Sequence, residues 1–388
     1  MKRLGLTTLC LLLFVMYSCR TDDDIVQPDI TDLDRHTRTE VVGMYVLCEG
    51  NMGSNKATLD YLDLSGDTAR YLKNIFPSRN PSQVMMLGDV GNDAKIYGSR
   101  LWLVINCSNK VEVCTADSAF SLGHVDIPNC RYVCFDGGYA YVSSYVGEVG
   151  RSSVLGSVYK VDTLTLRVMG RCNVGYQPEE MAIVNGKLYV ANSGGYQPLM
   201  SPPQPYDHTV SVIDLQTFTE ERKIDVAPNL HRLRSDRHGQ LWVSCRGDYG
   251  DYPERLYLLR PDAQGLMQKA DSVDTAVSDL YLRGDSLCFI GSSYDANWQR
   301  KVSSGIIDTS TGRMVSTRLF DDSEAQIETA YGLMVHPVTG DVYVMDATNY
   351  VSSGRLFCFG SNGQLKWKTL TGDIPGHGCW LTEVRSKN

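Results

Sequence analysis

The stretch LYVANSGG at residues 188–195, followed by TVSVID at residues 209–214, decides the fold. The first segment places a tyrosine between apolar neighbours and then passes into polar residues and glycines, which is typical of a short buried strand that ends in a loop. The second segment alternates apolar and polar residues, as a half-buried strand does. Together they predict two neighbouring strands joined by a loop.

Both segments recur along the chain at intervals of about 50 residues, within the range of propeller blades. The first recurs with an aromatic or similar residue at its centre: Tyr45, Trp102, Tyr141, Tyr189, Trp242, Cys288 and Tyr343. The second recurs as alternating apolar and polar residues at positions 57–64, 110–117, 157–164, 209–215, 255–260, 304–309 and 354–360. Seven copies of each predict a repeat fold of seven units.

A third segment, often opened by proline, precedes each aromatic strand. Proline at the first residue of a strand costs no hydrogen bond of the sheet. The copies begin at Pro81, Pro128, Pro178, Pro228, Ala276, Ala330 and Pro375. With a looser outer strand, each repeat has four strands, called a to d from the inside outward. The chain starts at a b strand and ends at an a strand, which predicts an all-β, seven-bladed β-propeller whose C-terminal strand closes the first blade.

The N-terminus has the pattern of an export signal. Lys2 and Arg3 precede an apolar run at residues 4–16, which is too short to span a bilayer. Cys19 then follows in a context similar to a relaxed bacterial lipobox, which predicts a lipoprotein acylated at Cys19. A plain cleaved secretory signal is the alternative. The expected organisation is a signal peptide at residues 1–18, a lipid-anchored flexible tether at 19–41 and the propeller at 42–388.

Charge and motifs narrow the function. The net charge of −8 argues against a nucleic-acid backbone as the main partner. The remaining cysteines show no CxxC pattern, so most are expected in the core, with a disulfide framework as the alternative. No metal-binding, cofactor-binding or catalytic motif is present, so neither a metal, a cofactor nor catalysis is expected. Glu49, Glu180 and Asp279 remain the candidates for an acid–base pair if the protein is an enzyme.

Several segments resemble a known propeller family. The LYVANSGG and TVSVID segments, together with VGYQPEEM at 174–181, resemble the YVTN/YncE-type repeat. CEGNMGSN at 48–55 is similar to the start of surface lipoprotein propellers of gut-type Gram-negative bacteria. IPNCRY at 127–132 resembles their NPRY segment, with Cys130 inserted. The resemblance covers roughly residues 42–384.

That resemblance implies a function. The subfamily includes BtuG-like proteins, which capture cobalamin at the cell surface for a TonB-dependent outer-membrane transporter, and uncharacterised surface-layer proteins. The expectation is therefore a surface-exposed outer-membrane lipoprotein, attached by its N-terminal lipid, that binds cobalamin or another corrinoid as a ligand. A periplasm-facing location is the alternative location. A propeller scaffold that docks a protein or a glycan is the alternative function.

The binding site is expected on the face that carries the b-to-c loops and the starts of the a strands. The loops supply a rim of tyrosines at similar places: Tyr145, Tyr196, Tyr249, Tyr294 and Tyr350. The a strands supply a polar hub: Arg131, Glu180, His231, Asp279, Tyr331 and His377. Tyrosine offers rigid contact area with a polar tip, which suits an amphipathic ligand. Alternatively each tyrosine packs against the next blade, and Arg131 pairs with Glu180 or Asp279.

Overall fold

The computed structural model describes residues 37–82, 86–149, 154–294 and 300–386. Cys19, the signal peptide and nearly all of the tether lie outside these ranges. The chain divides into one large unit, residues 41–383, and a small unit formed by residues 1–40 and 384–388. In the small unit, Arg385 pairs with Glu40, with Nη1 and Oε2 3.2 Å apart. Within the described ranges, no helix is long and apolar enough to cross a membrane.

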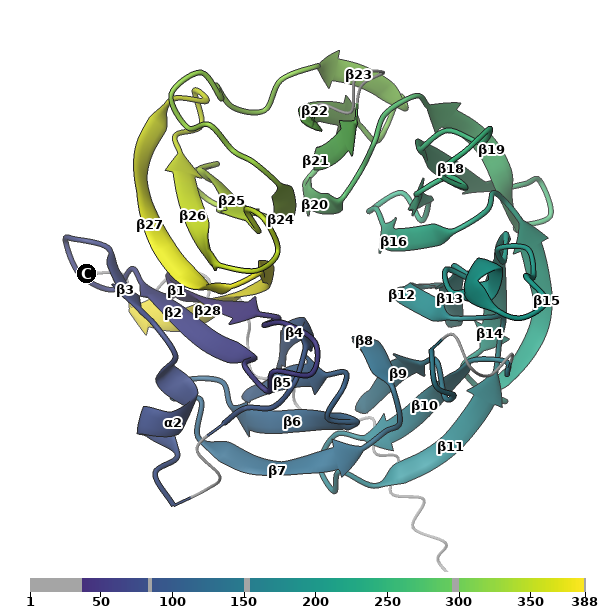
Figure 1. The fold of residues 1–388 in the computed structure, drawn as a ribbon, viewed down its shortest axis with the longest axis horizontal. Helices are drawn as coiled ribbons and strands as arrows, with labels where there is room; N and C mark the ends of the chain where they lie inside the picture. The colour runs from purple at the N-terminus through teal and green to yellow at the C-terminus, as the bar shows by residue number, and fades with distance from the viewer. Residues whose placement is uncertain (1–36, 83–85, 150–153, 295–299, 387–388) are drawn as a thin grey trace, which may run out of the picture. The chain divides into compact units, whose positions relative to one another are not determined.

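The large unit is built from β-sheets that follow one another around a central axis (Figure 1). The described residues form seven antiparallel four-stranded sheets, so the seven-bladed prediction is confirmed. Blade 1 consists of β28 (Pro375–Ser386), β1 (Thr37–Cys48), β2 (Thr58–Asp63) and β3 (Arg70–Leu72). Blade 2 consists of β4 (Gly91–Tyr97), β5 (Arg100–Ile105), β6 (Lys110–Thr115) and β7 (Ser121–Asp126). Blade 3 consists of β8 (Cys130–Asp136), β9 (Tyr139–Ser144), β10 (Ser157–Asp162) and β11 (Val168–Asn173).

The remaining four blades have the same strand order from the axis outward. Blade 4 consists of β12 (Pro178–Val184), β13 (Lys187–Asn192), β14 (Thr209–Asp214) and β15 (Thr219–Asp225). Blade 5 consists of β16 (Leu230–Ser235), β17 (Leu241–Cys245), β18 (Arg255–Pro261) and β19 (Met267–Val273). Blade 6 consists of β20 (Asp279–Arg283), β21 (Ser286–Tyr294), β22 (Arg300–Asp308) and β23 (Arg313–Ser316). Blade 7 consists of β24 (Ala330–Val335), β25 (Val342–Asp346), β26 (Ser353–Phe359) and β27 (Leu365–Asp373).

The two ends of the propeller sequence meet in blade 1, as predicted. Strand β28 is the innermost strand of this sheet and is hydrogen-bonded to β1, and Figure 1 shows the yellow β28 beside the purple β1. The residues beside these strands also bond to each other: the backbone N–H of Glu49 donates to the carbonyl of Ile374 at 2.8 Å. The ring is therefore closed by hydrogen bonds between strands from opposite ends of the chain, and β28 covers the inner edge of β1.

The aromatic motif marks the b strands because these strands are buried on both faces between neighbouring sheets. Trp102 in β5 and Trp242 in β17 are fully buried. Trp242 also places its indole N–H 2.9 Å from a carboxylate oxygen of Asp236. The cysteines behave as small core residues: all ten in the described ranges are free thiols, and only Cys107 and Cys134 are partly exposed.

One predicted strand start is wrong. Pro81 does not open an a strand, because β4 begins ten residues later at Gly91. The chain before Pro81 forms a single helical turn, α2 (Ile75–Arg79), in which Ile75 and Phe76 are buried. Asn80 ends this turn and donates its side-chain amide to the carbonyls of Phe76 and Ala119, at 2.9 and 3.0 Å. Proline after such a helix end simply prevents the helix from continuing.

Candidate functional site

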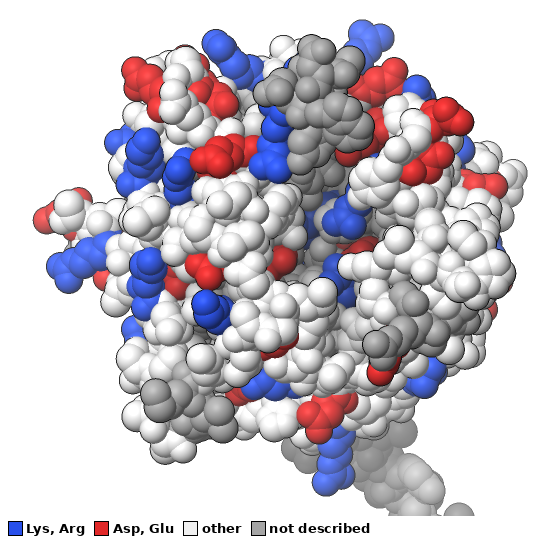
Figure 2. Space-filling model, viewed as in Figure 1, with Lys and Arg blue, Asp and Glu red and all other residues white. Residues whose placement is uncertain are grey.

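The strand order places two sets of connections on one face of the propeller. In an antiparallel a–b–c–d sheet, the b-to-c and d-to-a connections leave from the same end, and we call this end the loop face. All five predicted rim tyrosines belong to b strands or b-to-c loops of this face. Figure 2 shows the molecule along the view of Figure 1, with a central hollow bordered by both basic and acidic side chains.

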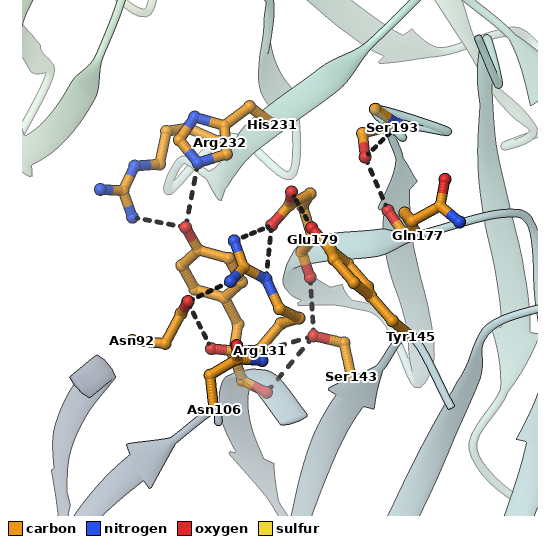
Figure 3. A network of polar contacts seen from close by, with 12 residues as sticks. Asn92, Asn106, Arg131, Ser143, Tyr145, Gln177, Glu179, Ser193, His231 and Arg232 are labelled. Carbon is orange, nitrogen blue, oxygen red and sulfur yellow. Dashed lines mark hydrogen bonds and ion pairs between the residues drawn. The ribbon is translucent and has the colours of Figure 1, made fainter. Parts of the chain in front are cut away.

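Over blades 3 and 4, the predicted residues form a closed polar cluster (Figure 3). Arg131 lies over the ring of Tyr145, with 4.8 Å between the guanidinium carbon and the ring centroid. It pairs with Glu179, with Nη2 and Oε2 3.1 Å apart. The Tyr145 hydroxyl donates to the other oxygen of Glu179. Tyr145 is 4% exposed, so it is part of the wall, whereas Tyr196 beside it is 38% exposed.

The partner of Arg131 is thus Glu179, and not Glu180 or Asp279. Those two carboxylates instead join neighbouring blades. Glu180 accepts the backbone N–H of Leu233 in the next blade at 3.1 Å, and Asp279 accepts that of Leu333 at 2.8 Å. Asp93 in blade 2 does the same for Val133 at 3.0 Å. This recurring bond gives Glu180 and Asp279 a structural role between inner strands.

Arginine and lysine side chains neutralise these carboxylates within the central channel. Arg234 pairs with Glu180, and Nε of Arg232 lies 3.3 Å from Asp279. A cavity of about 650 Å³ opens along this channel, on the side of the a-to-b turns, and is lined by Lys95, Arg232, Asp279 and other a-strand residues. Because its charges are already paired, this cavity offers few polar groups that still need a partner.

Blade 7 and the closing strand β28 contribute a second cluster of polar side chains near the loop face. The Tyr331 hydroxyl donates to Glu49 at 2.8 Å, and Nε2 of His377 lies 3.3 Å from the same carboxylate oxygen. Burial, followed by the charge of Glu49, holds the pKa of Tyr331 well above its usual value. The ring of Tyr350 stands edge-on to Tyr331, at 5.6 Å and 90°. Two of the predicted residues, Tyr331 and His377, therefore meet at Glu49, and Tyr350 packs against Tyr331.

A pocket of the loop face lies between blades 5, 6 and 7 and has a volume of about 630 Å³. We call it the tyrosine pocket. It is lined by His231, Arg246, Tyr249, Gly250, Tyr252, Pro253, Glu254, Val277, Ser278, Ser292, Ser293, Tyr331 and Tyr350. This volume falls within the range of sites for drug-sized ligands. Tyr249 is 76% exposed and Tyr350 is 41% exposed, so both offer ring surface to the pocket.

Four of the predicted site residues line this pocket: Tyr249, Tyr350, His231 and Tyr331. Six others do not line it: Tyr145, Tyr196, Arg131, Glu180, Asp279 and His377. Tyr294 ends β21, and its side chain lies outside the described set.

Sequence reasoning missed Arg246, which directly follows the b strand of blade 5. Tyr145 holds the same place after the b strand of blade 3. Aligning YVSSY at 141–145 with WVSCR at 242–246 would have found Arg246.

Arg246 and His231 determine the electrostatics of the tyrosine pocket. Nη2 of Arg246 lies 2.8 Å from Nε2 of His231. A guanidinium can only donate, so Nε2 accepts and the imidazole proton is on Nδ1. Burial, and then the charges of Arg246 and Arg232, hold the pKa of His231 well below its usual value. His231 is therefore a neutral residue that positions a cation at the wall of the pocket.

Solved structures show the same architecture. Hydrazine synthase from Kuenenia stuttgartiensis aligns with a TM-score of 0.60 at 15% identity, over 76% of this chain and 95% of that one. A protein of unknown function from Desulfotomaculum acetoxidans aligns with a TM-score of 0.60 at 11% identity, over 88% and 99%. A quinonprotein alcohol dehydrogenase-like protein from Bacteroides thetaiotaomicron aligns with a TM-score of 0.54 at 12% identity, over 88% and 79%.

The chain is a seven-bladed β-propeller. Identities this low establish the fold alone. No protein family and no curated protein sequence matches this chain. Within the described ranges, no group of three or more His, Cys, Asp and Glu side chains is placed to hold a metal ion. The tyrosine pocket combines aromatic rings, hydroxyl groups and one cation, which is a set suited to binding.

Proposed function

We propose that this protein binds an amphipathic small molecule in the tyrosine pocket. The observation that carries the proposal is the convergence of Tyr249, Tyr252, Tyr331 and Tyr350, from blades 5 and 7, on one cavity of the loop face. Aromatic rings supply apolar contact at little entropic cost, and their hydroxyls meet polar edges of a ligand. Pockets of this volume, with aromatic walls and a few polar groups, are the usual form of small-molecule sites.

Cobalamin, or another corrinoid, is the first ligand to test. A corrin ring has apolar faces, and amide groups project from its edge, which matches a pocket with aromatic walls and hydroxyl tips. In this proposal the protein is a lipoprotein anchored through Cys19 at the outer-membrane surface, and it passes its ligand to a TonB-dependent transporter. The support for ligand identity, anchor and transporter is the sequence resemblance described above, together with the pattern around Cys19.

Isothermal titration calorimetry of the purified protein with cobalamin tests this proposal. We expect binding at micromolar concentrations or tighter, and Tyr249→Ala should weaken it roughly tenfold, as truncation of an aromatic anchor does. Phe120→Ala is the matched control, because Phe120 is an exposed aromatic residue at a c-to-d turn of the opposite face. An absence of heat at micromolar concentrations would exclude cobalamin. Equal affinities of the wild type and Tyr249→Ala would place the ligand elsewhere.

A protein-docking scaffold is the second candidate, and one observation favours it. Four apolar or aromatic side chains in b-to-c loops are strongly exposed: Met52 at 82%, Leu199 at 69%, Tyr249 at 76% and Val351 at 66%. Exposed apolar groups on one face are typical of interaction surfaces. A partner that is retained on immobilised protein equally well with and without cobalamin, and lost with Leu199→Ser, would favour docking over ligand capture.

A further inference from the structure

The tyrosine pocket contains a cation that the protein itself leaves without a counter-ion. In the described part of the chain, Arg246 forms no ion pair with a carboxylate, and its guanidinium is hydrogen-bonded to the neutral His231. Burial lowers the pKa of Arg246 and the charge of Glu179 raises it above its usual value, but Glu179 is already paired with Arg131. The other arginines near the channel differ: Arg131 pairs with Glu179, and Arg232 pairs with Asp279. Arg246 thus differs from both in having no carboxylate partner in the described residues.

The position of Arg246 is fixed by its surroundings. Its backbone N–H donates to the carbonyl of Asn229 at 3.0 Å, which anchors it at the end of β17. Nε2 of His231 then holds Nη2 from the other side at 2.8 Å. His231 is 5% exposed, and its Nε2 also lies 3.0 Å from the hydroxyl of Tyr132. A guanidinium held in this way keeps most of its donors available to a ligand and loses little entropy on binding.

The acid among the residues that line the pocket does not neutralise this cation. Glu254 lines the same cavity and is half-buried, but it forms no ion pair with Arg246. The hydroxyls of Ser293 and Tyr249 also line the cavity, and in the described residues neither has a protein partner. These groups can donate hydrogen bonds to an oxyanion that the guanidinium binds.

We propose that Arg246 is an anion-binding subsite of the tyrosine pocket, and that the natural ligand carries a carboxylate or phosphate group. This inference rests on the proposed function, since it assigns one chemical feature to the ligand of the same pocket. The oxyanion accepts hydrogen bonds from the guanidinium, and the apolar part of the ligand lies against the rings of Tyr249 and Tyr350. Glu254, on the loop of blade 5, selects against a second negative group.

Two corrinoid probes test the subsite. Cobalamin carries a nucleotide loop with a phosphodiester, whereas cobinamide lacks that whole loop, base and sugar included, so the contribution of the phosphate is the part of the difference that Arg246→Gln removes. We expect cobalamin to bind roughly 10- to 100-fold more tightly, as for loss of a hydrogen-bonded charged group. Arg246→Gln should remove this preference, and Arg246→Lys should restore part of it. Arg237→Gln is the control, because it removes one positive charge from an a-to-b turn of the opposite face.

Inorganic phosphate provides a test that does not depend on the corrinoid. At tens of millimolar, phosphate should give the wild type a higher thermal midpoint than chloride of equal ionic strength does. Arg246→Gln should have the same thermal midpoint in both salts. If the two corrinoids bind equally and phosphate has no specific effect, the subsite is refuted while ligand binding stands. If neither corrinoid binds but phosphate stabilises through Arg246, the subsite stands and the corrinoid is refuted. Should Arg246→Gln fail to fold, Arg246→Lys and the two wild-type comparisons decide.

Discussion

Neutralising Glu179 is expected to destabilise the propeller through Arg131. Glu179 is 1% exposed and forms the only carboxylate contact that the described residues give to Arg131, with distances of 3.1 Å to Nη2 and 3.3 Å to Nε. In Glu179→Gln the shape is kept and the charge is lost. The guanidinium then keeps Asn92 as a neutral partner and the ring of Tyr145 as a weak one.

The size of the effect follows from burial. Removing one partner of a buried ion pair costs about 3–5 kcal/mol, because the other charge stays desolvated. The amide oxygen of glutamine can still accept one hydrogen bond, and the side chain of Arg131 is 17% exposed. The lower end of the range, about 3 kcal/mol, is therefore expected. In a domain of roughly 340 residues this lowers the thermal midpoint by about 4 °C.

Urea unfolding followed by tryptophan fluorescence measures this cost. The free energies of unfolding of Glu179→Gln, Arg131→Gln and the double variant form a cycle, in which a coupling of about 2 kcal/mol is expected. Glu254→Gln is the control, because burial already raises the pKa of Glu254 and neutralising it costs little. A Glu179→Gln variant within about 0.5 kcal/mol of the wild type, or strictly additive single effects, would refute the reasoning.

Three further expectations concern protonation, closure and thiols. Burial depresses the pKa of His231 in the folded state, so the free energy of unfolding that is present above about pH 6.5 falls on acidification by up to about 1.4 kcal/mol per pH unit. Urea unfolding of the wild type and of His231→Gln at pH 7.5 and 5.5 measures this loss. An equal change in the free energy of unfolding for the two proteins would contradict it. Deleting residues 375–388 removes β28, so limited proteolysis should degrade blade 1 first. Burial raises the pKa of Cys114 and Cys379, so a thiol reagent should leave both unmodified until urea is added.

The fold could be predicted because one physical requirement repeats seven times. A b strand lies between two sheets, so it must be apolar on both faces and can carry a large ring such as Trp102 or Trp242. That requirement produces the periodic motif. The start of an inner strand has no comparable signature, and proline alone was misleading at Pro81. Residues 75–79 instead form a helical turn held by burial of Ile75 and Phe76, which is a local arrangement outside the repeat.

The site was predicted only in part, because the inner strands are irregular where they approach the loop face. In β12 the pairing register shifts between Pro178 and Met181, and β8 and β16 shift at the corresponding place. A bulge of this kind interrupts the alternation of side chains and re-aims them. Glu179 and Glu180 lie within this shifted stretch, where their directions cannot be read from the alternation of a regular strand, and both are 1% exposed.

This irregularity also separates the roles of the two carboxylates. Glu179 bonds Arg131 and Tyr145 near the loop face, whereas Glu180 bonds the inner strand of the next blade. A polar residue at the start of an a strand can thus either join two blades or form part of the loop face. Its sequence position does not decide which of the two roles it has. The residue after each b strand follows a regular strand and keeps its place from blade to blade, as Tyr145 and Arg246 do. Arg246, at that position, lines the tyrosine pocket together with the hub residues His231 and Tyr331, so both kinds of position supply ligand contacts in this propeller.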